Sequence, residues 1–107
     1  MSRTVFITGT SRGIGRATAE VFAQNGWRVI AHARNETSNF IEFCSRISAT
    51  PVYFDMLDTA AMKECVKELK KNKTVIDALV NNAGIAHGGL FQMTPVSNIK
   101  KVFDVNL

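Results

Sequence analysis

A glycine-rich stretch near the N-terminus, Gly9 to Gly15, constrains the fold of this chain more than any other. It follows an apolar run, residues 5–7, and opens into a pattern of helical spacing. Glycines here allow a tight turn, a close approach of the backbone to a ligand, and close packing of a helix on a sheet. The stretch therefore predicts a strand, a turn and a helix N-terminus.

The same stretch predicts a site for a phosphate group. The unpaired N–H groups and the dipole of a helix N-terminus both favour an anion at this position. The spacing is Gly-x-x-x-Gly-x-Gly, not the generic Gly-x-Gly-x-x-Gly dinucleotide pattern. An ordinary strand-to-helix turn is the alternative, but the placement between an apolar strand and an amphipathic helix favours a nucleotide site.

The rest of the chain alternates between helical and strand patterns. In the first helix Ile14, Ala17, Val21 and Phe22 mark the apolar face, and Asn25-Gly26 ends it. Strand 27–33 comes next, then a helix that begins at 37–39 and buries Phe40, Phe43, Cys44 and Ile47, and then strand 52–54. The third helix is capped by Asp58 or Thr59 and buries Met62, Cys65, Val66 and Leu69. Strand 75–80, a glycine-bearing loop 85–93 and a helix that starts at Thr94-Pro95 complete the expected elements.

This alternation predicts an α/β fold, with a parallel sheet in the doubly wound order 3-2-1-4 and helices on both faces. The first two helices cover one face and the third covers the other, which separates Cys44 from Cys65. We expect one domain over residues 1–107. Strand 75–80 is apolar yet lies at the edge in this order, and the last helix has no later partner. Both features predict a homo-oligomer and a chain that stops partway through a sheet.

Composition excludes several classes of protein. The chain has 107 residues and a net charge of +4, but much of the excess charge is Lys67, Lys70, Lys71 and Lys73 at one helix end. Cations are favourable at a helix C-terminus, so these lysines are interpreted as a solvated helix end. The positive net charge therefore does not indicate a nucleic-acid partner, and we expect none. No apolar run is long enough to cross a bilayer, which predicts a cytoplasmic protein without membrane contact. Two cysteines build neither a disulfide framework nor a metal site.

Four motifs together resemble the short-chain dehydrogenase/reductase family along the whole chain. They are Thr8 to Gly15, Asp55-Met56, Asn81-Asn82-Ala83-Gly84 and Asn106. The residue sequence of the turn is most similar to that of the NADPH-dependent 3-oxoacyl carrier-protein reductases. The resemblance implies a partial Rossmann fold, here the dinucleotide-binding half. It implies that Gly9, Ser11, Arg12, Gly13, Ile14 and Gly15 bind pyrophosphate, that Asp55 and Met56 meet the adenine, and that Asn81, Ala83 and Gly84 flank the ribose.

The charge after the second strand predicts NADP(H) as the cofactor. Dinucleotide folds that bind NAD place an acidic residue there for the ribose 2′-hydroxyl, whereas a 2′-phosphate requires a cation. This chain has Arg34 there, and Arg12 adds a second cation beside the turn. A guanidinium binds phosphate with two parallel hydrogen bonds. A solvated loop arginine is the alternative for Arg34.

The resemblance also implies chemistry that this chain does not complete. The family transfers a hydride between nicotinamide and a carbonyl or alcohol substrate, using a tyrosine, a lysine four residues later and a serine. The single tyrosine, Tyr53, precedes Leu57 at that spacing and is expected to pack in a strand. Asn106 matches the asparagine of the proton relay. His87 and His32 are interpreted as incidental. We therefore expect a fragment that binds the cofactor without turnover; the alternative is a non-catalytic nucleotide-binding or assembly module.

Overall fold

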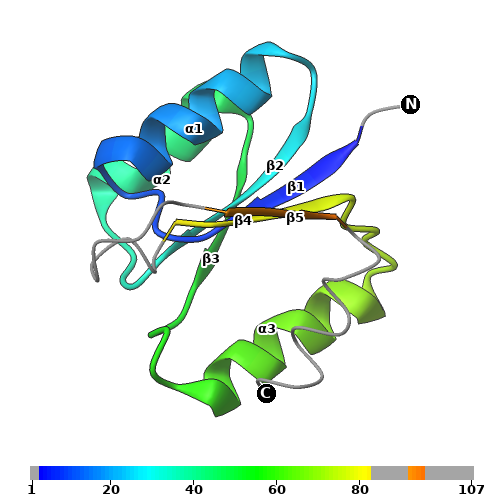
Figure 1. Cartoon of the computed structure of the whole chain (residues 1–107). Helices are drawn as coiled ribbons and strands as arrows, with labels where there is room; N and C mark the ends of the chain where they lie inside the picture. The colour runs from blue at the N-terminus through cyan, green and yellow to red at the C-terminus, as the bar shows by residue number, and fades with distance from the viewer. Residues whose placement is uncertain (1–2, 83–91, 96–107) are drawn as a thin grey trace.

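A computed structural model describes residues 3–82 and the backbone of 92–95 (Figure 1). The elements are β1 (Thr4–Ile7), α1 (Gly13–Gln24), β2 (Arg28–Ala33), α2 (Ser38–Ile47), β3 (Thr50–Tyr53), α3 (Thr59–Lys71), β4 (Ala78–Asn81) and β5 (Gln92–Pro95). The final helix predicted after Pro95 and the loop histidine, His87, lie outside the described residues.

The sheet has the order β3-β2-β1-β4-β5. The first four strands are parallel, which confirms the predicted order 3-2-1-4. In the register, Ile7 pairs with Ala31 of β2 on one side and with Val80 of β4 on the other. The carboxyl ends of these strands therefore meet at one edge of the sheet.

The prediction that the fourth strand forms the edge of the sheet is wrong. β5 pairs antiparallel with β4, from Ala78 opposite Pro95 to Asn81 opposite Gln92. Residues 92–95 were expected to end a loop and start a helix at Thr94, but the unpaired N–H and C=O groups of an edge strand favour pairing with a nearby segment. Because β4 is paired with β5, an unpaired edge at β4 no longer supports the prediction of self-association.

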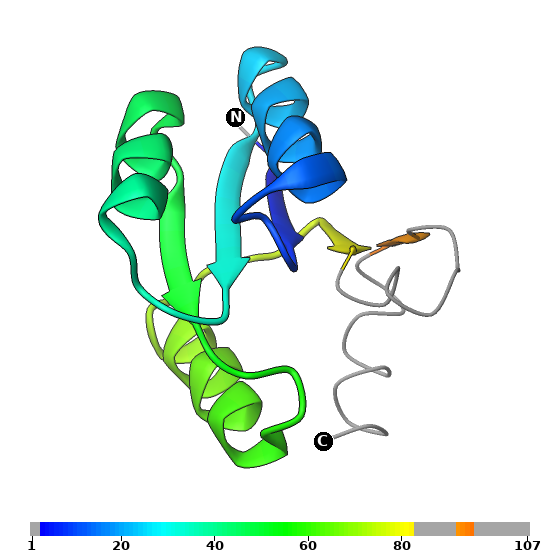
Figure 2. The same cartoon turned by 90° about the vertical axis from the view of Figure 1, so that its left-hand side faces the viewer.

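Helices α1 and α2 cover one face of the sheet and α3 covers the other (Figures 1 and 2), and an apolar cluster lies on each face. The cluster under α1 and α2 includes Phe40, Phe43 and Cys44. The cluster on the opposite face contains Phe6 and Leu69, with Cys65 packed against it from α3. The predicted placement of the two cysteines on opposite sides of the sheet is confirmed.

The buried face of α1 differs in part from the predicted one, although Phe22 packs against the core as expected. Ile14 is 53 % exposed and Val21 56 % exposed, while Gly15 and Ala19 are buried. Helical spacing alone cannot choose between these faces. Small side chains let the helix backbone come close to the sheet, and the larger Ile14 and Val21 then point outward.

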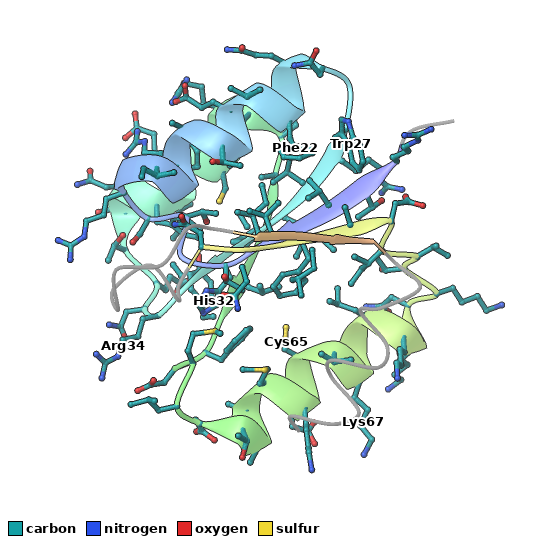
Figure 3. All side chains as sticks on the ribbon, in the orientation of Figure 1. Phe22, Trp27, His32, Arg34, Cys65 and Lys67 are labelled. Atoms are coloured by element: carbon teal, nitrogen blue, oxygen red, sulfur yellow. The ribbon has the colours of Figure 1, made fainter. Side chains whose placement is uncertain are left out.

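The other two helices begin as predicted. The Thr37 hydroxyl accepts a hydrogen bond from the Phe40 N–H at the start of α2, and the Asp58 carboxylate accepts one from the Ala61 N–H at the start of α3. Lys70 and Lys71 lie in the last turn of α3. Lys67 points away from the sheet, as expected for a solvated helix terminus (Figure 3). Within the described residues, every helix is too short or too polar to cross a bilayer.

Candidate functional site at the carboxyl edge of the sheet

The first turn of α1 offers backbone N–H groups at the carboxyl edge of the sheet. Arg12 is the N-cap residue of α1, directly before its first turn, and no side chain caps the helix. Gly9 and Gly13 have φ of +66° and +65°, a conformation that strongly favours glycine. Residues 11–14 are exposed. The turn therefore presents donors to the solvent, where an anion can reach them.

Gly15 fixes how closely α1 approaches the turn. A Cβ at this position would overlap the Gly9 carbonyl oxygen and the side-chain nitrogen of Asn82. That Asn82 nitrogen donates a hydrogen bond to the Gly9 carbonyl oxygen at 3.0 Å. The absence of a side chain at Gly15 thus allows helix, turn and β4 to meet at one point.

β4 also holds the start of the turn through Thr8. The Thr8 N–H donates to the Val80 carbonyl oxygen at 3.0 Å, and the Asn82 N–H donates to the Thr8 hydroxyl oxygen at 3.0 Å. The Thr8 hydroxyl lies 3.3 Å from Oδ1 of Asn81. The asparagine pair therefore supports the turn from the side of β4. Ala83 and Gly84, the other predicted residues of this motif, and Asn106 lie outside the described residues.

β2 holds the turn from the other side, through His32. The Gly9 N–H donates to Nδ1 of His32 at 3.0 Å, and Nε2 lies 2.7 Å from the Phe54 carbonyl oxygen. The Thr10 N–H and hydroxyl both donate to the His32 carbonyl oxygen, each at 2.8 Å. His32 is 2 % exposed. His32 therefore has a structural role that its alternation within the strand did not reveal, while the prediction that it takes no part in the chemistry stays a prediction.

Arg34 and Asp55 form an ion pair at the same edge. The Arg34 guanidinium lies 3.2 Å from the Asp55 carboxylate, and these side chains are 74 % and 37 % exposed. The second Asp55 oxygen accepts a hydrogen bond from the Leu57 N–H at 2.9 Å. Arg34 points outward from the end of β2 (Figure 3). Met56, next to Asp55, packs against the cluster under α3. The ends of β2 and β3 are thereby joined.

The other candidate reactive groups are suppressed by burial. Burial raises the pKa of the Cys65 thiol to about 11 and raises the pKa of the Cys44 thiol, so both are protonated at neutral pH. Burial, and then the charge of Glu36, raise the pKa of Tyr53. Tyr53 packs edge-on against Phe40, which confirms its expected role in packing. No cluster of His, Cys, Asp or Glu suited to a metal ion occurs among the residues that the structure describes.

Comparison with known proteins identifies the family. The model of the short-chain dehydrogenase family matches residues 3–107. The match covers nearly the whole chain, and the order of the parallel strands agrees with it. The chain belongs to the short-chain dehydrogenase family.

Individual relatives agree with this assignment. Serine 3-dehydrogenase from Rhizobium radiobacter is 35 % identical over 100 % of this chain and 44 % of its own length. An NADPH-dependent 3-dehydrocapnine reductase from Ornithobacterium rhinotracheale is 32 % identical over 98 % of this chain and 38 % of its own. The chain thus spans less than half the length of these relatives.

A similar solved structure is a protein from Shigella flexneri described as a short-chain dehydrogenase and crystallised with NADP. It has a TM-score of 0.68 and 26 % identity, and the match covers 75 % of this chain and 36 % of that one. The fold described above is therefore one that is also found in a protein bound to NADP.

Replacing Gly15 by alanine tests the close contact between α1 and the turn. Helix propensity alone would stabilise the variant by about 0.5–1 kcal/mol. We expect the free energy of unfolding to fall instead, by about 1–3 kcal/mol, because the new methyl group overlaps Gly9 and Asn82. Urea denaturation measures the difference. A variant as stable as the wild type, or more stable, would contradict this packing.

Proposed function

We propose that the carboxyl edge of this sheet binds NADP(H), and that the whole protein is an oxidoreductase that transfers a hydride to or from a carbonyl or alcohol substrate. The observation that carries the proposal is the pairing of an uncapped helix N-terminus with a cation, Arg34, at the end of the neighbouring strand. One feature suits a pyrophosphate and the other a 2′-phosphate.

The turn fits the pyrophosphate by its free donors. Thr37 and Asp58 cap α2 and α3, but α1 has no acceptor of that kind. The first turn of α1 also carries no acidic residue that would repel an anion. The N–H groups of residues 11–15 are the proposed donors, with Gly9 giving the turn its shape rather than an N–H, because His32 accepts that one. The open space beside Gly13 leaves room for a ligand.

The Arg34–Asp55 pair is compatible with a 2′-phosphate at Arg34. An exposed ion pair contributes about 0–1 kcal/mol, so giving it up costs little. A phosphate accepts two parallel hydrogen bonds from a guanidinium and carries more charge than a carboxylate. Arg12 is exposed and makes no ion pair with any residue in the described part of the chain, so it is the proposed second cation.

The remaining predicted residues have proposed roles in the same site. Asp55 and Met56 are the proposed contacts of the adenine, and Asn81, with Ala83 and Gly84, those of the ribose. When bound, the nicotinamide supplies the hydride donor or acceptor. The residues described here bind and orient the dinucleotide. Asn106 is proposed to take part in a proton relay of the whole protein.

Charge reversal at Arg34 tests the choice of cofactor. In an Arg34→Asp variant we expect the affinity for NADPH to fall at least tenfold, with a much smaller change for NADH, since only NADPH carries the 2′-phosphate. Arg28→Asp is the matched control. It makes the same charge change at the amino end of the same strand, roughly 20 Å away. Calorimetric titration measures the affinities of the wild type and both variants for each of the two cofactors. Equal affinities for both cofactors throughout would refute the preference for NADP(H).

Turnover tests the catalytic part of the proposal. The sequence holds one tyrosine, and burial raises the pKa of Tyr53, the opposite of what proton transfer at neutral pH needs. We expect this chain to bind NADPH without oxidising it in the presence of carbonyl substrates, followed by absorbance at 340 nm. Substantial turnover would contradict the expectation. Cofactor-dependent oligomers without turnover would favour the non-catalytic alternative.

A further inference from the structure

The hydrogen bonds of His32 fix the position of its ring proton. A backbone N–H can only donate, so Nδ1, which faces the Gly9 N–H, must be the unprotonated acceptor. Nε2 then carries the hydrogen and donates it to the Phe54 carbonyl oxygen. The ring also stacks on Phe54, with centroids 4.1 Å apart. His32 is therefore held as one neutral tautomer, on the α3 side of the sheet (Figure 3).

These two bonds connect the two halves of the proposed dinucleotide site. Gly9 opens the turn that faces the pyrophosphate, and Phe54 directly precedes Asp55 and Met56, the proposed adenine contacts. The imidazole bridges the two segments across the end of β2. A displacement of the ring would move both segments relative to each other.

Protonation would break this bridge. A hydrogen on Nδ1 would point at the Gly9 N–H, so two donors would face each other. Desolvation by burial lowers the pKa of His32 below 6.5, while the hydrogen bond to Phe54 acts in the opposite direction. The nearest charged groups along the chain, Arg34 and Asp55, pair with each other at the surface. Cys65 of α3 packs against the apolar cluster that contains Phe54. Its thiol has a pKa of about 11, so it is neutral over the pH range considered and adds no charge.

We propose that His32 is a positioning residue for the dinucleotide, whose neutral imidazole holds the phosphate turn and the adenine segment in the arrangement that binds the cofactor. This inference rests on the proposed function. It follows that cofactor affinity declines as the imidazole takes up a proton, although His32 itself is buried beneath the turn.

Two variants separate hydrogen bonding from titration. His32→Gln supplies an acceptor and a donor but cannot be protonated, and His32→Leu supplies neither. NADPH affinity is measured by calorimetry between pH 5.5 and 8. At pH 7.5 we expect His32→Gln to bind within about threefold of the wild type and His32→Leu to bind about tenfold more weakly, because leucine leaves the Gly9 N–H and the Phe54 carbonyl oxygen without their ring partner.

The pH profile carries the test that a purely structural role would not pass. From pH 7.5 to 5.5 the wild type should lose more affinity than His32→Gln, by less than about tenfold, because the pKa of His32 lies below 6.5 and each unit of pH below the pKa gives at most a tenfold change. The titration of the cofactor's own phosphate is common to both proteins and cancels in this ratio. Parallel profiles for the two proteins would overturn the proposal.

Urea denaturation provides a readout without ligand. The unfolded chain binds a proton on His32 below pH 6.5, whereas the folded chain resists it, so stability is complete above that pH and declines as the pH falls toward the folded-state pKa. His32→Gln should lack this component of the decline. An equal decline in both proteins would count against the proposal.

Nuclear magnetic resonance of the wild type decides the matter where a variant fails to fold. The ring nitrogens of His32 should show the Nε2–H tautomer, and the Gly9 amide should titrate together with the ring. An Nδ1–H tautomer, or a Gly9 amide that ignores the titration, would overturn the inference. Failure of the wild type to bind NADPH at any pH would instead overturn the proposed function, while the tautomer remains measurable.

Discussion

The pairing of β1 with both β2 and β4 is the constraint on which the candidate site depends. β1 leads into the glycine turn, and its two neighbours hold that turn from opposite sides. His32 binds it from β2, and Asn82, the residue directly after β4, binds it from the other side. Because β2 and β4 both run parallel to β1, the sheet positions the turn. A phosphate-binding turn benefits from this arrangement, since donors that are already oriented bind an anion at lower entropic cost.

The same arrangement separates support from recognition. Beneath the turn, buried groups such as His32 and Thr10 use their hydrogen bonds within the protein. Above it, residues 11–14 are exposed to solvent, and so is Arg34, which pairs with Asp55. The Arg34–Asp55 pair joins β2 to β3 at the surface, where solvent keeps such pairs weak and exchangeable. A weak pair can hold the ends of β2 and β3 together and still release the cation to the proposed 2′-phosphate.

The sequence predicted the order of the sheet, because the alternation of strands and helices limits the parallel topologies to a few. It also predicted the start of α2 near Thr37 and the cap of α3 at Asp58, which depend on neighbouring residues alone. It did not predict β5, since residues 92–95 form a strand only against the edge of β4. It misjudged the face of α1 because spacing does not reveal the close approach at Gly15. The hydrogen bonds of His32 were not predicted for a similar reason, because its partners, Gly9 and Phe54, are 23 and 22 residues away in the sequence.

Binding of a phosphorylated dinucleotide at the carboxyl edge is tested most directly by amide chemical shifts of the 15N-labelled chain during titration with NADPH. The shifts should change at the first turn of α1, at Arg34, at Asp55 and Met56, and at Asn81 and Asn82. Amides at the amino edge, including those of Arg28 and Thr74, should not respond. Changes confined to the amino edge, or no changes at millimolar NADPH, would contradict a dinucleotide site at the carboxyl edge.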